Sequence, residues 1–130
     1  MDSIADMLVR LSNGLRVKKE TVEMPHSRLK EEIGKLLLAE GYIDKCEVLT
    51  RLNKKQLRFV LKYAAGGKRG VIEGVKRVSR PGRRVYVGAG AVPRIRSGFG
   101  TAIISTPQGL MTDETAREKK IGGEVICYIW

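Results

Sequence analysis

The C-terminal third of the chain carries the stretch that decides its fold, residues 98–130: GFGTAIISTPQGLMTDETAREKKIGGEVICYIW. Its first apolar run, 101–104, is short and ends at a polar segment, 105–109, a pattern that predicts a buried strand followed by a loop. Two hydroxyls, an amide and a glycine lie in that loop. Because no base stands near to activate a hydroxyl, the loop is typical of a segment that hydrogen-bonds a partner.

A short helix and a last strand are predicted after this loop. Thr112 is placed to cap the helix N-terminus, and two acids follow in the first turn, where the helix dipole favours them. Lys119 and Lys120 fall in the last turn, with Gly122 just beyond it as a stop signal. The apolar run 125–130 then predicts a terminal strand.

The first 63 residues are predicted to fold as α-β-α-β-β. Ser27 is expected to cap the second helix and Gly41 to end it. Gly34 costs about 1 kcal/mol inside a helix relative to alanine, so we expect close packing there. Apolar residues alternate with Arg58, Val60 and Lys62, the period of a half-buried strand.

Small residues at 64–70 mark the expected boundary between two domains, 1–64 and 65–130. Strands are expected near 71–78 and 84–87 in the second domain, before the elements described above. The predicted fold class is therefore α+β. We expect two small α/β domains packed side by side, an N-terminal α-β-α-β-β domain and a C-terminal domain of mostly antiparallel strands with one short helix.

Charge is the strongest feature of the composition: the 130 residues carry a formal net charge of +11, with a pI near 10.0. Such a basic chain favours a polyanionic partner, either nucleic acid or an acidic membrane surface, although some proteins are basic for solubility alone. The start Met1-Asp2-Ser3 lacks a basic signal-peptide region, and no apolar run is long enough to span a membrane, so we expect a cytoplasmic protein without a membrane partner.

Few residues are suited to catalysis or to metal binding. Cys46 and Cys127 lack metal-ligand spacing and are interpreted as reduced core cysteines. His26 is the one histidine, and Asp6, Asp44 and Asp113 are expected in different elements. We therefore expect no catalytic residue, no metal and no cofactor; an enzyme acting on RNA is the weakest alternative.

A basic cluster is the first candidate for nucleic-acid contact. Its members are Lys76, Arg77, Arg80, Arg83 and Arg84, followed by Arg94 and Arg96. The Pro81-Gly82 pair predicts a tight turn that projects cations on both sides, which favours phosphate contact; the alternative is a solvated charged turn. Tyr86 offers a face for base stacking, or is a half-buried sheet residue.

The 105–109 loop is the candidate for specificity, since phosphate contacts alone carry no sequence information. Ser105 and Thr106 can donate to and accept from a base edge or a ribose 2′-hydroxyl, with Gln108 as a second donor–acceptor and Gly109 closing the loop. The alternative is a turn whose hydroxyls bond their own backbone.

The turn before the last strand is a second candidate. Gly122 and Gly123 leave backbone N–H groups open to a ligand, and Glu124 either accepts from a base amine or binds a backbone amide within the protein.

Taken in order, these segments resemble the bacterial-type small-subunit ribosomal protein eight family. The family pattern of a Ser-Thr-Ser-x-Gly loop, a Met-Thr-Asp-x-x-Ala-Arg helix and a Gly-Gly-Glu turn is matched except that Pro107 replaces the second serine. Either that contact is missing here, or Pro107 stiffens the loop and Gln108 compensates. The similarity extends to the segments 4–8, 25–30, 40–43 and 78–86.

The resemblance implies a structural, non-enzymatic constituent of the small ribosomal subunit. In that family the Ser-Thr loop enters an RNA minor groove, the Gly-Gly-Glu turn lies near the RNA, and Lys30 matches a basic position whose simpler explanation is solubility. The implied partners are the central domain of small-subunit ribosomal RNA and the fifth protein of the subunit, with the chain a monomer outside the ribosome. Some members repress their own messenger. A free regulator that meets the same RNA fold only in messenger RNA remains an alternative.

Overall fold

The computed structural model describes residues 3–64, 70–95 and 99–130. The stretch 65–69, where the sequence placed a domain boundary, lies outside the described residues, as does Arg96 of the basic cluster. The chain divides into two compact units, which span 3–73 and 74–130. The predicted α+β class is confirmed, because each unit combines helix with antiparallel sheet.

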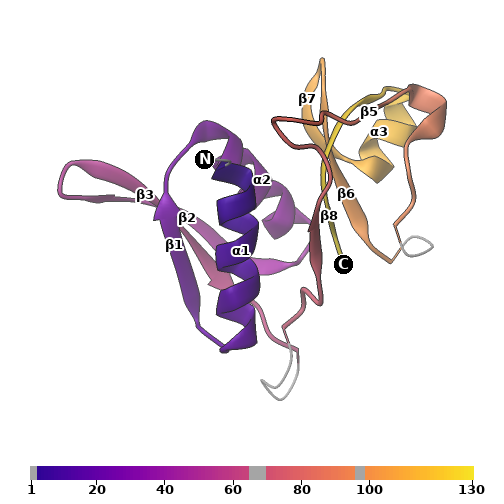
Figure 1. The fold of residues 1–130 in the computed structure, drawn as a ribbon. Helices are drawn as coiled ribbons and strands as arrows, with labels where there is room; N and C mark the ends of the chain where they lie inside the picture. The colour runs from indigo at the N-terminus through magenta and orange to yellow at the C-terminus, as the bar shows by residue number, and fades with distance from the viewer. Residues whose placement is uncertain (1–2, 65–69, 96–98) are drawn as a thin grey trace. The chain divides into compact units, whose positions relative to one another are not determined.

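The N-terminal unit follows the predicted order α-β-α-β-β. Its elements are α1 (Ser3–Arg16), β1 (Thr21–Pro25), α2 (Arg28–Ala39), β2 (Ile43–Arg51) and β3 (Lys54–Leu61). The three strands form one antiparallel sheet in the order β1-β3-β2, with α1 against β1 and α2 against β2 and β3 (Figure 1).

Burial in this unit follows the sequence pattern. Leu57 and Phe59 are fully buried and Leu61 nearly so, as the alternation along β3 predicts. Gly34 of α2 is buried too: a Cβ there would lie 2.6 Å from Cε1 of Phe59 and 2.7 Å from Sγ of Cys46. The close packing expected at Gly34 is therefore present, between α2 and the sheet.

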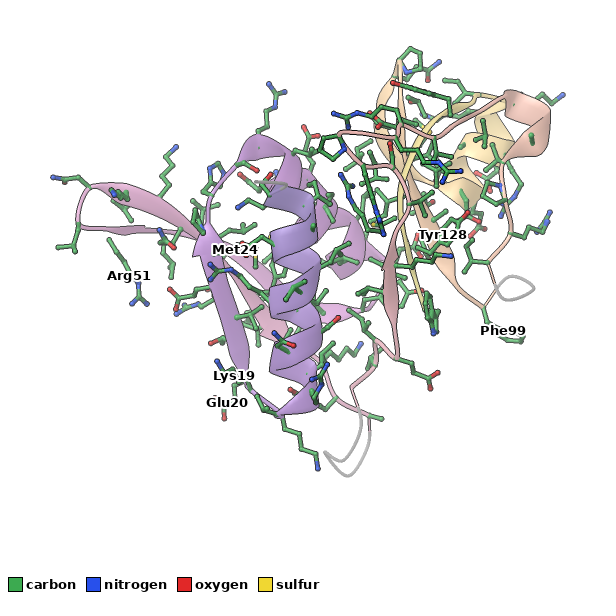
Figure 2. The ribbon with its side chains drawn as sticks, viewed as in Figure 1. Lys19, Glu20, Met24, Arg51, Phe99 and Tyr128 are labelled. Atoms are coloured by element: carbon green, nitrogen blue, oxygen red, sulfur yellow. The ribbon has the colours of Figure 1, made fainter. Side chains whose placement is uncertain are left out.

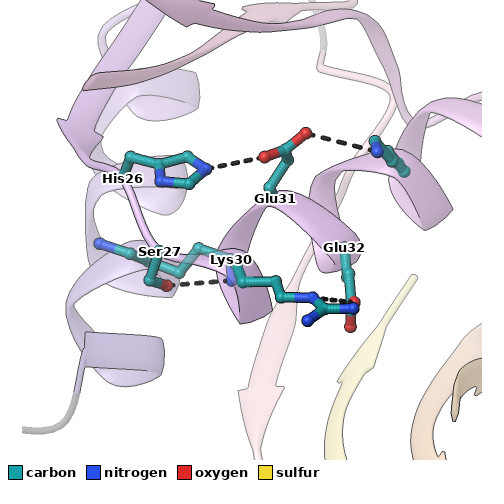
Figure 3. A network of polar contacts seen from close by, with 7 residues as sticks. His26, Ser27, Lys30, Glu31 and Glu32 are labelled. Carbon is teal, nitrogen blue, oxygen red and sulfur yellow. Dashed lines mark hydrogen bonds and ion pairs between the residues drawn. The ribbon is translucent and has the colours of Figure 1, made fainter. Parts of the chain in front are cut away.

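Polar contacts fix the start of α2 (Figure 3). Ser27 is the N-cap, as predicted, and its side chain accepts a hydrogen bond from the backbone N–H of Lys30 at 3.2 Å. His26 Nε2 lies 2.7 Å from Oε1 of Glu31, whose Oε2 lies 3.3 Å from Nζ of Lys35. Glu31 thus joins the residue preceding the cap to the next turn of the helix.

The C-terminal unit is an antiparallel sheet of short strands with one helix. Its elements are β4 (Val75–Arg77), β5 (Tyr86–Val87), the 3-10 turn η1 (Ala89–Ala91), β6 (Thr101–Thr106), β7 (Gly109–Thr112), α3 (Asp113–Lys119) and β8 (Gly123–Ile129). The sheet order is β4-β8-β6-β7, and β5 also pairs with β8. The helix α3 packs on β6 and β7 over a core that includes Ala102, Ile104 and Val125.

Several predicted boundaries in this unit were wrong. The strand expected near 71–78 covers only 75–77, and the one expected at 84–87 covers only 86–87. Thr112 does cap α3, accepting from the backbone N–H of Thr115 at 3.3 Å. The helix ends through Lys120, which takes the left-handed conformation at φ 55°, so Gly122 is not its stop signal.

Candidate nucleic-acid interface

The predicted 105–109 loop is largely a β-hairpin. Strand β6 continues through Ser105 and Thr106, and Pro107 and Gln108 form a two-residue turn into β7. Gly109 closes the turn opposite Thr106 with φ 114°, a backbone conformation that side chains other than glycine rarely adopt. The expected end of the strand at Ile104 is therefore corrected: the hydroxyl residues lie in strand β6 rather than in a loop.

Thr106 uses its hydroxyl within this turn. Its Oγ1 accepts from the backbone N–H of Gln108 at 3.1 Å and donates to the carbonyl of Gly109 at 2.7 Å. The residue is only 9% exposed. The sequence left two interpretations open for the Ser-Thr pair: hydroxyls that contact RNA, or hydroxyls that bond their own backbone. Thr106 follows the second. Gln108 is exposed, so its side chain remains accessible at the hairpin tip.

Ser105 differs from its neighbour. It is half-buried, and its Oγ has no hydrogen-bond partner among the described residues. In the sheet Ser105 lies opposite Glu124 of β8, and Glu124 in turn lies opposite Tyr86 of β5. Directly opposed residues on neighbouring strands place their side chains on one face, about 5 Å apart. Tyr86, Glu124 and Ser105 therefore form one row across three strands, which we call the cross-strand row.

Tyr86 gives this row an exposed aromatic ring. Its exposed fraction is 68%, although it lies in a strand. This contradicts the alternative that it is a half-buried sheet residue. A planar ring on an exposed sheet surface can stack on an unpaired base, while the hydroxyl of Ser105, two strands away in the same row, hydrogen-bonds another part of the nucleic acid.

The two glycines before Glu124 serve close packing within the protein. A Cβ on Gly123 would collide with the carbonyl oxygen of Ser105, and one on Gly122 would collide with the carbonyl oxygen of Val87. From the sequence we interpreted this glycine pair as a place where a ligand comes close to the backbone. In the structure it is the backbones of the neighbouring strands that come close to the two glycines. This close strand packing lets the cross-strand row form.

Glu124 is also bound by side chains of residues 79–84, which surround the Pro81-Gly82 pair and which we call the basic turn. Its Oε2 accepts from the hydroxyl of Ser79 and, at 3.2 Å, from Nη1 of Arg84. Ser79 is fully buried, and its Oγ also accepts from the backbone N–H of Val85 at 3.2 Å. The sequence suggested a backbone amide as the internal partner of Glu124, and the described partners are side chains instead. Ser79 was missed because a serine beside a Pro-Gly turn has no distinctive pattern.

The basic turn presents two free cations. Arg80 and Arg83 exchange backbone hydrogen bonds of 3.0 Å in both directions around Pro81-Gly82. Both side chains are exposed, and neither has an ion-pair partner in the part of the chain that the structure describes. Lys76 is exposed as well, whereas Arg77 donates to the carbonyl of Ile126 at 3.3 Å. The Pro-Gly turn thus projects cations outward, as the sequence predicts.

Lys30 is not part of this exposed set. It lies in α2 of the N-terminal unit and is 3% exposed, which excludes the simple explanation of surface solubility. Burial lowers the pKa of its ammonium, Asp6 opposes that shift, and Arg10 adds to it. The RNA contact that the resemblance implies for Lys30 stays a prediction, and the side chain is enclosed within the protein.

The described residues 3–64, 70–95 and 99–130 contain no group of three or more His, Cys, Asp or Glu side chains placed to hold a metal ion. Among these residues there is also no helix long and apolar enough to cross a bilayer. Both cysteines are free thiols, and burial raises the pKa of Cys127 to about 12.

Comparison with known proteins identifies the family. The model of the family "Ribosomal protein S8" matches residues 2–130. The chain belongs to the ribosomal protein S8 family. It is 53% identical over 128 residues to "Small ribosomal subunit protein uS8" of Aromatoleum aromaticum, covering 98% of this chain and 96% of the relative.

Other relatives agree with this assignment. A protein of the same name from a Polaromonas species is also 53% identical over 128 residues, with the same coverage. One from Dictyoglomus turgidum is 51% identical over 129 residues, 99% of this chain and 97% of the relative. The resemblance recognised from the sequence motifs is confirmed, and the chain is a member of a family of structural, ribosomal proteins.

Proposed function

We propose that this protein is a structural constituent of the small ribosomal subunit that binds directly to the central domain of small-subunit ribosomal RNA. Membership of the ribosomal protein S8 family and the name shared by its relatives support the subunit assignment. The observation that carries direct RNA binding is the cross-strand row, in which Tyr86, Glu124 and Ser105 lie on one face of the sheet.

The proposed contact has a specific part. Ser105 donates to or accepts from a base edge or a 2′-hydroxyl, and the exposed ring of Tyr86 stacks on an unpaired base. Gln108 adds a donor–acceptor pair from the hairpin turn. Thr106, Gly109, Gly122 and Gly123 act by shaping the strands and turn that present these groups.

The second part of the contact is electrostatic. Arg80 and Arg83 bind phosphates, and Arg84 orients Glu124 while remaining partly exposed at 48% of its side chain. Arg80 and Arg83 have no ion-pair partner among the described residues, and Arg84 has Glu124, so binding RNA breaks few bonds within the protein. The other carboxylate oxygen of Glu124, Oε1, which has no hydrogen-bond partner among the described residues, accepts from a base amine.

By binding two segments of the RNA at once, the protein fixes their relative orientation. The protein organises the central domain so that later subunit proteins can join, among them the fifth protein of the subunit. It is a cytoplasmic monomer before it joins the ribosome. Repression of its own messenger would use the same RNA-binding surface, because a messenger that mimics the ribosomal site presents the same groups.

A titration with protein-free central-domain RNA tests the proposal. A scrambled duplex of equal length is the control, and each titration is run at two salt concentrations. We expect a preference for the central-domain RNA of about a thousandfold that persists at the higher salt. Equal affinity for both RNAs that falls together with salt would overturn direct specific binding.

Variants of Tyr86 sharpen this test. Tyr86→Ala removes the ring and should weaken binding of the central-domain RNA by about 1–3 kcal/mol, the range for base–aromatic stacking. Tyr86→Phe keeps the ring and is the matched control, expected to bind nearly as wild type. Because Tyr86 is exposed, neither variant should change the free energy of unfolding by more than about 0.5 kcal/mol.

Sedimentation distinguishes the proposed function from the alternative of a free regulator that binds only messenger RNA. A constituent of the subunit co-sediments with small subunits from cell extracts, whereas a free regulator does not. An enzyme acting on RNA is the other alternative, and the family, which consists of structural ribosomal proteins, weighs against it.

A further inference from the structure

The hairpin that joins β2 to β3 has an unusual turn. Its two turn residues, Leu52 and Asn53, both take the left-handed conformation, at φ 51° and φ 63°, and Arg51 pairs with Lys54 on either side of them. Two consecutive residues of this kind define the type I′ turn, whose twist matches that of the strands. Asparagine and glycine are preferred at both positions, since a Cβ is disfavoured there. Asn53 follows this rule and Leu52 does not.

Nothing within the described part of the protein compensates for leucine at this position. Leu52 is 97% exposed, so it contributes almost no buried apolar surface. A single exposed leucine is ordinary on a protein surface. A leucine that is exposed and also held in a disfavoured backbone conformation is less so, because asparagine or glycine would relieve the strain without loss of packing.

Positive charge surrounds this leucine. The segment 51–55, which we call the hairpin tip, contains three cations and no acid, and all five residues are exposed. Arg51 is 3.2 Å from Oε2 of Glu23, but Lys54 and Lys55 have no carboxylate partner among the described residues. Figure 1 shows the hairpin projecting beyond the helices of its unit, and Figure 2 labels Arg51 near its far end.

Glu47 of β2 and Glu23 of the neighbouring strand β1 do not neutralise the hairpin tip. Glu47 of β2 is occupied by Arg58 of β3, with Nε and Oε1 3.1 Å apart. Glu23 already pairs with Arg51. Two unpaired ammonium groups beside an exposed apolar side chain complement a surface that offers phosphates next to less polar sugar and base faces, which is what the wide minor groove of an RNA helix presents.

We propose that three residues of the hairpin tip, Leu52, Lys54 and Lys55, form a second RNA-docking surface, separate from the cross-strand row. Lys54 and Lys55 bind phosphates, while Leu52 packs against sugar or base faces between them, as apolar wedges do in other nucleic-acid grooves. The inference rests on the proposed function only in taking ribosomal RNA as the partner. It assigns to the N-terminal unit a contact made by named residues of its own.

Three variants of the full-length protein test the proposal with intact, protein-free small-subunit ribosomal RNA. Leu52→Asn removes the wedge and suits the turn better, so it should unfold at an equal or higher denaturant concentration yet bind about three- to tenfold more weakly. Asn53→Gly is the matched control: it also improves the turn but keeps Leu52, and its affinity should equal that of wild type. A residue that served only the fold could not lose binding while gaining stability.

The third variant reports the charge. Lys54→Ala combined with Lys55→Ala should lower the slope of log affinity against log salt by about 1.5, the loss expected for two phosphate contacts. Leu52→Asn should leave that slope unchanged because it removes no cation.

The outcomes separate this inference from the proposed function. If wild type shows no preference for ribosomal RNA over the scrambled duplex, the proposed function fails. If wild type is specific but Leu52→Asn and the double lysine variant bind as wild type, the hairpin tip does not dock on RNA. A variant that binds protein-free RNA normally but is lost from assembled subunits would show that the tip contacts a protein, which also overturns the inference.

Discussion

The hydroxyl of Ser79 donates a hydrogen bond to the Glu124 carboxylate while accepting one from the backbone N–H of Val85. One fully buried side chain therefore connects the basic turn to the strand at the centre of the cross-strand row. Glu124 also pairs with Arg84, so the electrostatic and the specific parts of the proposed interface share this carboxylate.

Ser79→Ala should lower the free energy of unfolding by about 1–3 kcal/mol, since it leaves the backbone N–H of Val85 without its partner and removes one of the two hydrogen bonds to the Glu124 carboxylate. Urea denaturation measures the change. Arg80→Ala, at the adjacent exposed position, is the control and should stay within about 0.5 kcal/mol of wild type. Equal stability of the Ser79 variant and wild type would mean that the turn is not held through Ser79.

Mutations of Thr106 and Ser105 should affect different properties, stability for Thr106 and RNA binding for Ser105. Thr106→Val keeps the shape but removes two local hydrogen bonds, and should cost about 1 kcal/mol of stability. Ser105→Ala should leave stability unchanged and weaken specific RNA binding by about 1 kcal/mol, roughly fivefold. Denaturation and RNA titration of both variants check this. Loss of stability in Ser105→Ala would show that its hydroxyl supports the fold.

Gly123→Ala should be among the most damaging single substitutions, at about 2–4 kcal/mol or more, because the added methyl would meet the backbone carbonyl of Ser105. A backbone group in a paired strand cannot move aside as a flexible side chain can. Gly82→Ala is the matched control, since nothing lies within 4 Å of a Cβ there. Thermal unfolding compares the two, and similar melting temperatures would contradict the packing role of Gly123.

Local signals predicted the N-terminal unit well. The N-cap at Ser27, the buried alternation along β3 and the tight packing at Gly34 each depend on residues close in sequence or on a simple period. The family was also recognisable, because its motifs keep their order along nearly the whole chain.

Long-range pairing explains what the sequence did not reveal. Strand β7 has only four residues and β5 only two, too few for a period to appear. The row of Tyr86, Glu124 and Ser105 depends on register between strands far apart in the chain. The burial of Lys30 was missed for the same reason, since a lysine at the start of a helix ordinarily faces solvent.

Cys127 should resist alkylation in the native protein. It is fully buried, and burial raises the pKa of its thiol to about 12, so little reactive thiolate exists at pH 8. We expect iodoacetamide to modify Cys127 at least about a hundredfold more slowly in the folded protein than in urea. Mass spectrometry of peptides containing Cys127 and the half-buried Cys46 measures both rates. Rapid native labelling of Cys127 would place it nearer to the surface.

Acid should weaken the start of α2 through Glu31. The hydrogen bond from His26 holds the pKa of this carboxyl below its usual 4.5, with Lys35 adding to the effect. A carboxyl whose folded pKa is depressed contributes stability that is complete above the unfolded pKa and is lost as the pH falls through the folded one. The stability advantage of wild type over Glu31→Gln should therefore shrink as the pH falls below about 4.5. Denaturation between pH 3 and 7 measures it. The control is Glu32→Gln. Oε1 of Glu32 lies 3.4 Å from Nε of Arg28, whose side chain is 92% exposed. The stability difference between this variant and wild type should be smaller and should vary less with pH. If the Glu31 and Glu32 variants follow the same curve, the contact with His26 does not stabilise the helix.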